Sequence, residues 1–128
     1  MNLSESVEMY LETIYFIQEN HGHAHVIDIA NMMNVSKASV SKTMNQLKEE
    51  GLVNKETYGH ITLTDKGETI SREIVKKHYS ISRFLEKSLK LNPSEAAKNA
   101  CKMEHIISDE MIKAIEMYLE EIDQLAGK

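Results

Sequence analysis

The spacing of two short helical segments around a tight turn is the feature of this sequence that most constrains its fold. Residues 26–33 carry apolar side chains at helical spacing, and residues 34–36 form a turn in which Ser36 caps the next helix. That next helix is expected over 37–50, and Gly51 suits the position just beyond a helix end. Two helices joined in this way predict a helix-turn-helix whose second helix reads DNA.

The segments around this motif predict the rest of the architecture. Residues 52–57 and 61–63 alternate apolar and polar side chains about a turn at 58–60, which predicts a two-stranded wing. Helical periodicity predicts four further helices, over 4–20, 65–89, 93–105 and from 109 to the C-terminal end. Ser4, Thr64 and Ser108 are the expected capping residues, and Asn92-Pro93 starts the third of these helices. The expected fold class is mainly α with a small β-wing. A winged helix-turn-helix DNA-binding domain (1–71) precedes a helical metal-binding and dimerisation domain (72–128).

The charge distribution supports a nucleic-acid partner for the middle of the chain only. The net charge of −5 argues against DNA until it is divided along the sequence. Residues 36–90 hold eleven basic and seven acidic side chains, whereas residues 1–35 and 91–128 are both net acidic. The basic block coincides with the predicted reading helix and wing, where phosphates need neutralising.

Composition excludes several other classes. No apolar run approaches 18 residues and the N-terminus lacks a signal-peptide pattern, which predicts a cytoplasmic protein without a membrane partner. The single cysteine cannot form an internal disulfide. No segment shows the oxyanion hole or convergent polar groups that a cysteine hydrolase needs, so neither an enzyme nor a small organic substrate is expected.

Three chemically different metal ligands fall on one turn of predicted helix. Cys101, Glu104 and His105 stand at i, i+3 and i+4, so a thiolate, a carboxylate and an imidazole would share one face. Each residue alone has an ordinary interpretation, as a buried core side chain or a solvated surface side chain. The combination of the three favours a binding site for a divalent transition metal. Residues on other helices must complete the coordination, and the candidates are Met9, Glu12 and His78.

The remaining histidines give a weaker signal. His21, His23 and His25 alternate with small residues in one loop, and His60 stands at the predicted wing. The loop could bind metal by itself, but a solvated or phosphate-facing segment is the favoured interpretation.

Short and basic side chains mark the surface expected to face DNA. Small residues let a helix approach the major groove, and lysines reach bases or phosphates. The alternative is a winged helix used for protein contacts. The predicted DNA-contacting residues are Ser36, Lys37, Ala38, Ser39, Ser41 and Lys42 on the reading helix, with Thr57, Tyr58 and His60 on the wing.

The last helix predicts a homodimer. Its apolar stripe, together with the end of the 65–89 helix, exceeds what a small helical unit can bury alone, and a dimer suits a two-fold operator. The alternative is that these helices simply pack on the first helix.

Four stretches together resemble one family of metal-dependent repressors, the diphtheria-toxin-repressor and manganese-transport-regulator family. The likeness covers almost the whole chain in a short form, without the SH3-like third domain of longer members. It implies a repressor of metal-uptake genes that binds double-stranded operator DNA as a dimer when loaded with Fe(II) or Mn(II). The matching stretches are residues 8–15, 35–41, 63–67 and 101–110.

The resemblance is divided between two branches. Met9 and Cys101 are similar to primary-site ligands of the iron branch, whereas Glu12 and His78 are similar to the manganese pair. The positions that match the iron branch's ancillary site are not ligands here. Fe(II) is therefore favoured, Mn(II) is the alternative, and Co, Ni and Zn are expected to bind in vitro. A winged-helix sensor of an oxidant or organic ligand, using Cys101, is the remaining alternative.

Overall fold

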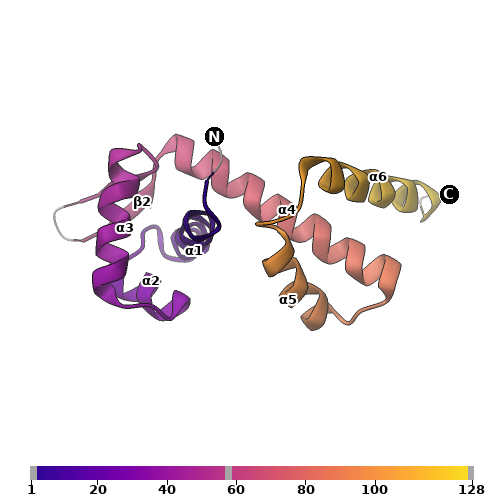
Figure 1. Cartoon of the computed structure of the whole chain (residues 1–128), viewed down its shortest axis with the longest axis horizontal. Coiled ribbons are helices and arrows are strands. Elements are labelled where there is room, and N and C mark those ends of the chain that lie inside the picture. The colour runs from indigo at the N-terminus through magenta and orange to yellow at the C-terminus, as the bar shows by residue number, and fades with distance from the viewer. Residues whose placement is uncertain (1–2, 57–58, 127–128) are drawn as a thin grey trace. The chain divides into compact units, whose positions relative to one another are not determined.

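A computed structural model describes residues 3–56 and 59–126, and the chain divides into two compact units (Figure 1). Unit 1 is Met1–Arg72 and unit 2 is Glu73–Lys128. Within the described part of the chain, no helix has the length and apolarity needed to cross a membrane. The elements are α1 (Glu5–His21), α2 (Val26–Met33), α3 (Lys37–Glu49), β1 (Val53–Lys55), β2 (Ile61–Leu63), α4 (Asp65–Leu89), α5 (Pro93–Met103) and α6 (Asp109–Ala126).

Helix α1 forms where capping and periodicity predict it. The Ser4 hydroxyl accepts a hydrogen bond from the Val7 amide at 3.2 Å, which satisfies one of the free donors at the helix start. Gly22 ends the helix with φ +82°, a left-handed conformation that favours glycine. The face buried in the core of unit 1 is made of Tyr10, Leu11, Ile14 and Ile17.

The helix-turn-helix is confirmed, with its helices nearly at the predicted bounds. Asn34 takes a left-handed conformation after α2, and the Ser36 hydroxyl accepts from the Ser39 amide at 3.1 Å to begin α3. Helix α3 ends one residue earlier than predicted, with Glu50 as its C-cap and Gly51 beyond it at φ +76°. Its buried stripe is Val40, Met44 and Leu47, each 0% exposed.

The wing is an antiparallel pair of strands, in which β2 spans the predicted 61–63 and β1 is shorter than the predicted 52–57. Val53 pairs with Leu63 and Lys55 with Ile61. An isolated bridge extends this sheet to the loop after α1, because Ala24 and Ile61 exchange both backbone hydrogen bonds at 2.8 Å. Both of these residues are 0% exposed. The wing is therefore packed into the core of unit 1 at the bridge.

The start of α4 lies in backbone contact with the end of the helix-turn-helix. The Thr64 hydroxyl donates to the Gly51 carbonyl at 2.6 Å and accepts from the Gly67 amide at 3.1 Å, as its predicted capping role requires. A β-carbon at Gly67 would overlap the carbonyl oxygen of Leu52. Glycine is therefore required here for close approach of two backbone segments.

Unit 2 has its own small core. The second half of α4 packs with α5 and α6 (Figure 1). The predicted apolar stripe of α6 is only partly buried, since Met111, Tyr118 and Leu125 are exposed. The core residues are Ile81, Leu85, Ala96, Ala100, Ile112, Ile115 and Leu119.

The Gly67 contact generates a stability prediction. Gly67→Ala should lower the free energy of unfolding by about 1–3 kcal/mol, because a backbone clash outweighs the roughly 1 kcal/mol that alanine normally gains over glycine in a helix. Urea denaturation measures the change. Lys66→Ala, at the exposed neighbouring position, is the control and should stay within about 0.5 kcal/mol of the wild type. A Gly67→Ala protein as stable as the wild type would contradict the close approach.

Candidate metal centre and nucleic-acid interface

Four potential metal ligands of unit 2 come from α4 and the end of α5. His78 lies on α4, Cys101 lies on the last turn of α5, and Glu104 is the C-cap residue of that helix. His105 follows in the turn between α5 and α6. Asn92 and Pro93 start α5 as predicted, with the Asn92 side chain accepting from the Glu95 amide.

A buried carboxylate lies at the middle of this cluster. Glu104 is 1% exposed, and its Oε2 lies 3.1 Å from Nδ1 of His78. Its other oxygen, Oε1, lies 3.2 Å from Nε2 of His105. The Cys101 thiol, on an exposed residue, lies 3.7 Å from Nδ1 of His78. Each oxygen of one carboxylate therefore faces a different imidazole.

The expectation of three ligands on one helical face needs correction. Helix α5 ends at Met103, so Glu104 and His105 lie in the turn that follows and only Cys101 is inside the helix. As a result Cys101, His78 and Glu104 bring one donor atom each within 4.8 Å of one another. His105 approaches the opposite oxygen of Glu104.

The donor set suits a divalent transition metal. In tetrahedral geometry, two ligand atoms bound to one such ion at about 2.0–2.3 Å lie roughly 3.3–3.8 Å apart. Nδ1 of His78 lies 3.1 Å from Oε2 of Glu104 and 3.7 Å from Sγ of Cys101, which is close to this range. A thiol, two imidazoles and a carboxylate also match the ligand preferences of iron, manganese and zinc-class ions. Burial of Glu104 favours a cationic partner, because a carboxylate removed from water needs its charge compensated.

The two predicted ligands of the first helix belong to unit 1. Met9 and Glu12 lie one turn apart on α1, where Met9 is 42% exposed and Glu12 is half-buried. Their participation in a metal site with the unit 2 donors stays a prediction.

The predicted DNA-contacting residues of the reading helix lie on its first two turns. Ser41 is half-buried and the others are exposed. Ser36 also has a structural role, since its hydroxyl donates to Ser39 Oγ at 3.0 Å while capping α3. Lys55 of the wing donates to Asn45 of α3 at 3.0 Å and so ties the wing to the reading helix. Thr57 and Tyr58 lie outside the described residues.

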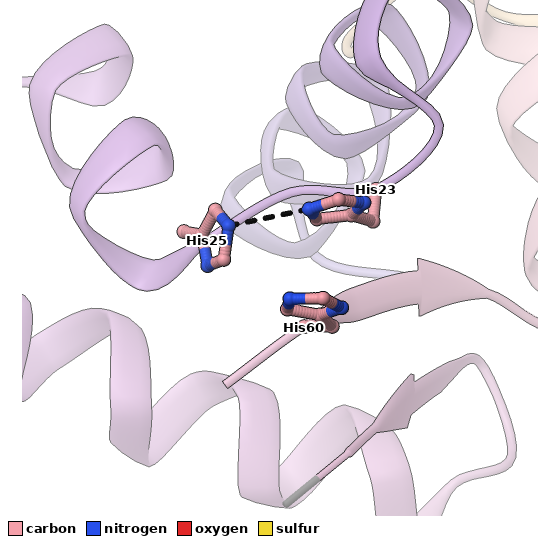
Figure 2. A group of neighbouring side chains, drawn as sticks. All are labelled: His23, His25 and His60. Carbon is pink, nitrogen blue, oxygen red and sulfur yellow. Dashed lines mark hydrogen bonds between the residues drawn. The ribbon is translucent and has the colours of Figure 1, made fainter. Parts of the chain in front are cut away.

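His60 contacts His23 and His25, which the sequence did not predict. Its ring stacks on His23 with centroids 4.0 Å apart, and the His25 ring stands edge-on to both (Figure 2). Desolvation, followed by the neighbouring rings of His60 and His25, lowers the pKa of His23. The only sequence signal was the alternation of His23 and His25, which puts both on one side of an extended segment.

Family models match both parts of the chain. Residues 2–61 match the iron dependent repressor N-terminal DNA binding domain. Residues 64–125 match the iron dependent repressor metal binding and dimerisation domain.

Curated proteins and solved structures agree with these matches. An uncharacterized HTH-type transcriptional regulator of Methanocaldococcus jannaschii is 38% identical over 119 residues, covering 92% of this chain and 95% of that protein. The diphtheria toxin repressor of Corynebacterium diphtheriae is 28% identical over 96% of this chain, which spans 54% of its length. A manganese-dependent transcriptional repressor solved with manganese superposes with a TM-score of 0.82 at 29% identity, covering 89% of this chain and 52% of that one.

The resemblance seen in the sequence is therefore confirmed over both units. The winged helix-turn-helix lies within the match to the DNA binding domain, and the cluster around Glu104 lies within the match to the metal binding and dimerisation domain. The chain belongs to the iron dependent repressor family of metal-dependent transcriptional repressors.

Proposed function

We propose that this protein binds operator DNA as a homodimer when loaded with Fe(II) or Mn(II), and thereby represses metal-uptake genes. Unit 1 supplies the DNA-reading surface, and unit 2 supplies the metal ligands and the dimer contact. The observation that carries the proposal is the cluster around buried Glu104, in a chain whose other unit is a winged helix-turn-helix.

The ligand set we propose centres on Glu104. His78, Cys101 and Glu104 would hold one ion, and His105 with the other Glu104 oxygen would contribute to a second. Met9 and Glu12 remain predicted ligands. A carboxylate with an imidazole at each oxygen suits a bridging role, because its two oxygens can bind two adjacent ions.

The dimer proposal rests on apolar side chains that unit 2 leaves exposed. Met117 and Leu125 are 62% and 73% exposed, and Leu89 at the end of α4 is 62% exposed. Burying such side chains against a second copy would be favourable by roughly 1.5–3 kcal/mol each if burial is complete. A symmetric dimer also presents two reading helices to a two-fold operator.

We favour Fe(II) over Mn(II) as the natural metal. A thiolate is a softer ligand than a carboxylate and binds Fe(II) in preference to Mn(II). One matched structure holds manganese, and two structures of a single manganese-activated repressor hold Zn²⁺ or Cd²⁺. Ions beyond iron and manganese are thus expected to bind in vitro, since affinity for nitrogen and sulfur ligands rises toward the end of the first-row series.

DNA binding under anaerobic conditions tests the proposal. Fluorescence anisotropy with the DNA upstream of the protein's own gene should show binding with Fe(II) and none with a chelator, because only the loaded dimer is competent to bind. Fe(II) should act at lower free concentration than Mn(II). Binding that ignores chelator and responds to peroxide would overturn the metal proposal in favour of a redox sensor using Cys101.

Cobalt spectroscopy separates the ligands on the two sides of Glu104. Co(II) bound to the wild type should show a thiolate-to-cobalt charge-transfer band, because Cys101 shares an ion with His78 and Glu104. Cys101→Ala should abolish this band, and His105→Gln should preserve it. Lys102→Gln, at the adjacent exposed residue of α5, is the matched control. If His105→Gln lost the band as completely as Cys101→Ala, the assignment of His105 and Cys101 to different ions would be contradicted.

A charge substitution tests the reading surface. Lys42→Gln should weaken binding to all DNA sequences and lower the slope of log affinity against log salt by about 1, because one phosphate contact is lost. The matched control is Lys48→Gln, which removes the same exposed charge near the other end of α3. Equal effects of the two substitutions would place Lys42 outside the DNA contact.

A further inference from the structure

Unit 1 contains a second group of potential metal ligands, distinct from the family's metal-binding domain. His23 and His25 lie in the loop between α1 and α2, and His60 directly precedes β2. One ring nitrogen from each lies within 4.8 Å of the other two. The three side chains are half-buried and converge in Figure 2.

The backbone brings these residues together. Ala24 and Ile61 form an antiparallel bridge with two hydrogen bonds of 2.8 Å, and both point into the core at 0% exposure. Successive side chains on an extended segment point to opposite faces, so the flanking His23, His25 and His60 all lie on the other face of the bridge. Their convergence therefore follows from the bridge register.

We propose that His23, His25 and His60 bind a divalent transition-metal ion of the zinc class. Three imidazoles are a preferred donor set for such an ion, with a fourth position left for water. Nε2 of His23 and Nε2 of His25 lie 3.2 Å apart, compared with about 3.3 Å for two imidazole nitrogens on one tetrahedral zinc ion. The His60 ring stacks on His23, and its rotation would turn a ring nitrogen toward the same ion. The backbone need not move, because the bridge already fixes it.

The bound ion would link the helix-turn-helix to the wing. Helix α2 begins immediately after His25, whose amide donates to Asp28 at 3.2 Å, and β2 begins immediately after His60. An ion held by both segments would restrain the wing relative to α2. It would also add positive charge to a segment, residues 1–35, that has five acidic side chains and neither Lys nor Arg.

Zinc titration of the full-length protein, in competition with a chromophoric chelator, tests this site. Measurements in a Glu104→Gln background, as well as in the wild type, separate this site from the ions proposed for unit 2, because both of those ions share Glu104. His60→Gln and His23→Gln should each lower zinc affinity at this site by at least about tenfold, since even residues that only orient a metal ligand are worth about 10–100-fold. Circular dichroism checks that each variant is folded.

His21→Gln is the matched control, because His21 is exposed in the same segment and outside the cluster. It should retain the ion. In the Glu104→Gln background, zinc should also raise the urea midpoint of the protein with its three histidines intact and of His21→Gln, but not of His60→Gln.

Two results would overturn the proposal. Zinc affinity unchanged in both His60→Gln and His23→Gln would show that the cluster holds no ion. A loss in His21→Gln as large as in His60→Gln would show non-specific chelation by the loop. Because these readouts need neither DNA nor Glu104, they are independent of the operator-binding proposal.

Discussion

The backbone bridge between Ala24 and Ile61 is the contact on which the arrangement of unit 1 depends. Its two hydrogen bonds close a small sheet between segments 37 residues apart in the sequence, and both side chains enter the core. Gln18 of α1 reinforces the same junction by accepting from the Leu63 amide at 2.8 Å. With Lys55 bonded to Asn45, the wing is held to both α1 and the reading helix. A surface that reads DNA needs such fixed geometry, because base contacts depend on close and specific approach.

Unit 2 is organised around a different constraint, the burial of Glu104. A carboxylate at 1% exposure is costly unless polar or charged groups surround it. The end of α5 at Met103 turns this side chain inward, toward His78 on one side and His105 on the other. The same arrangement gathers imidazole and thiol donors around the carboxylate, a set that suits a transition metal. Packing of α4, α5 and α6 therefore places the donors of the proposed metal response.

Much of the fold could be predicted because its signals are local. Ser4, Ser36, Thr64 and Asn92 each cap the helix predicted for them, since capping involves residues two or three apart. The stripe of α3 is equally local, because a 3.6-residue period fixes which side chains share a face. The second strand matches its predicted bounds, whereas the extent of the first was overestimated, since strands are defined by a partner rather than by their own alternation.

The sequence by itself determined the helix-turn-helix, the wing, the helical second half and the residue types that suit a transition metal. Tertiary structure alone decided that Cys101 of α5 meets His78 of α4, a residue 23 positions earlier in the sequence. It also decided that His60 joins His23 and His25, through a bridge that no local pattern specifies. The physical reason is the same in both cases. Helix caps and periodicity depend on neighbours in sequence, whereas a binding site depends on where separate segments pack in space.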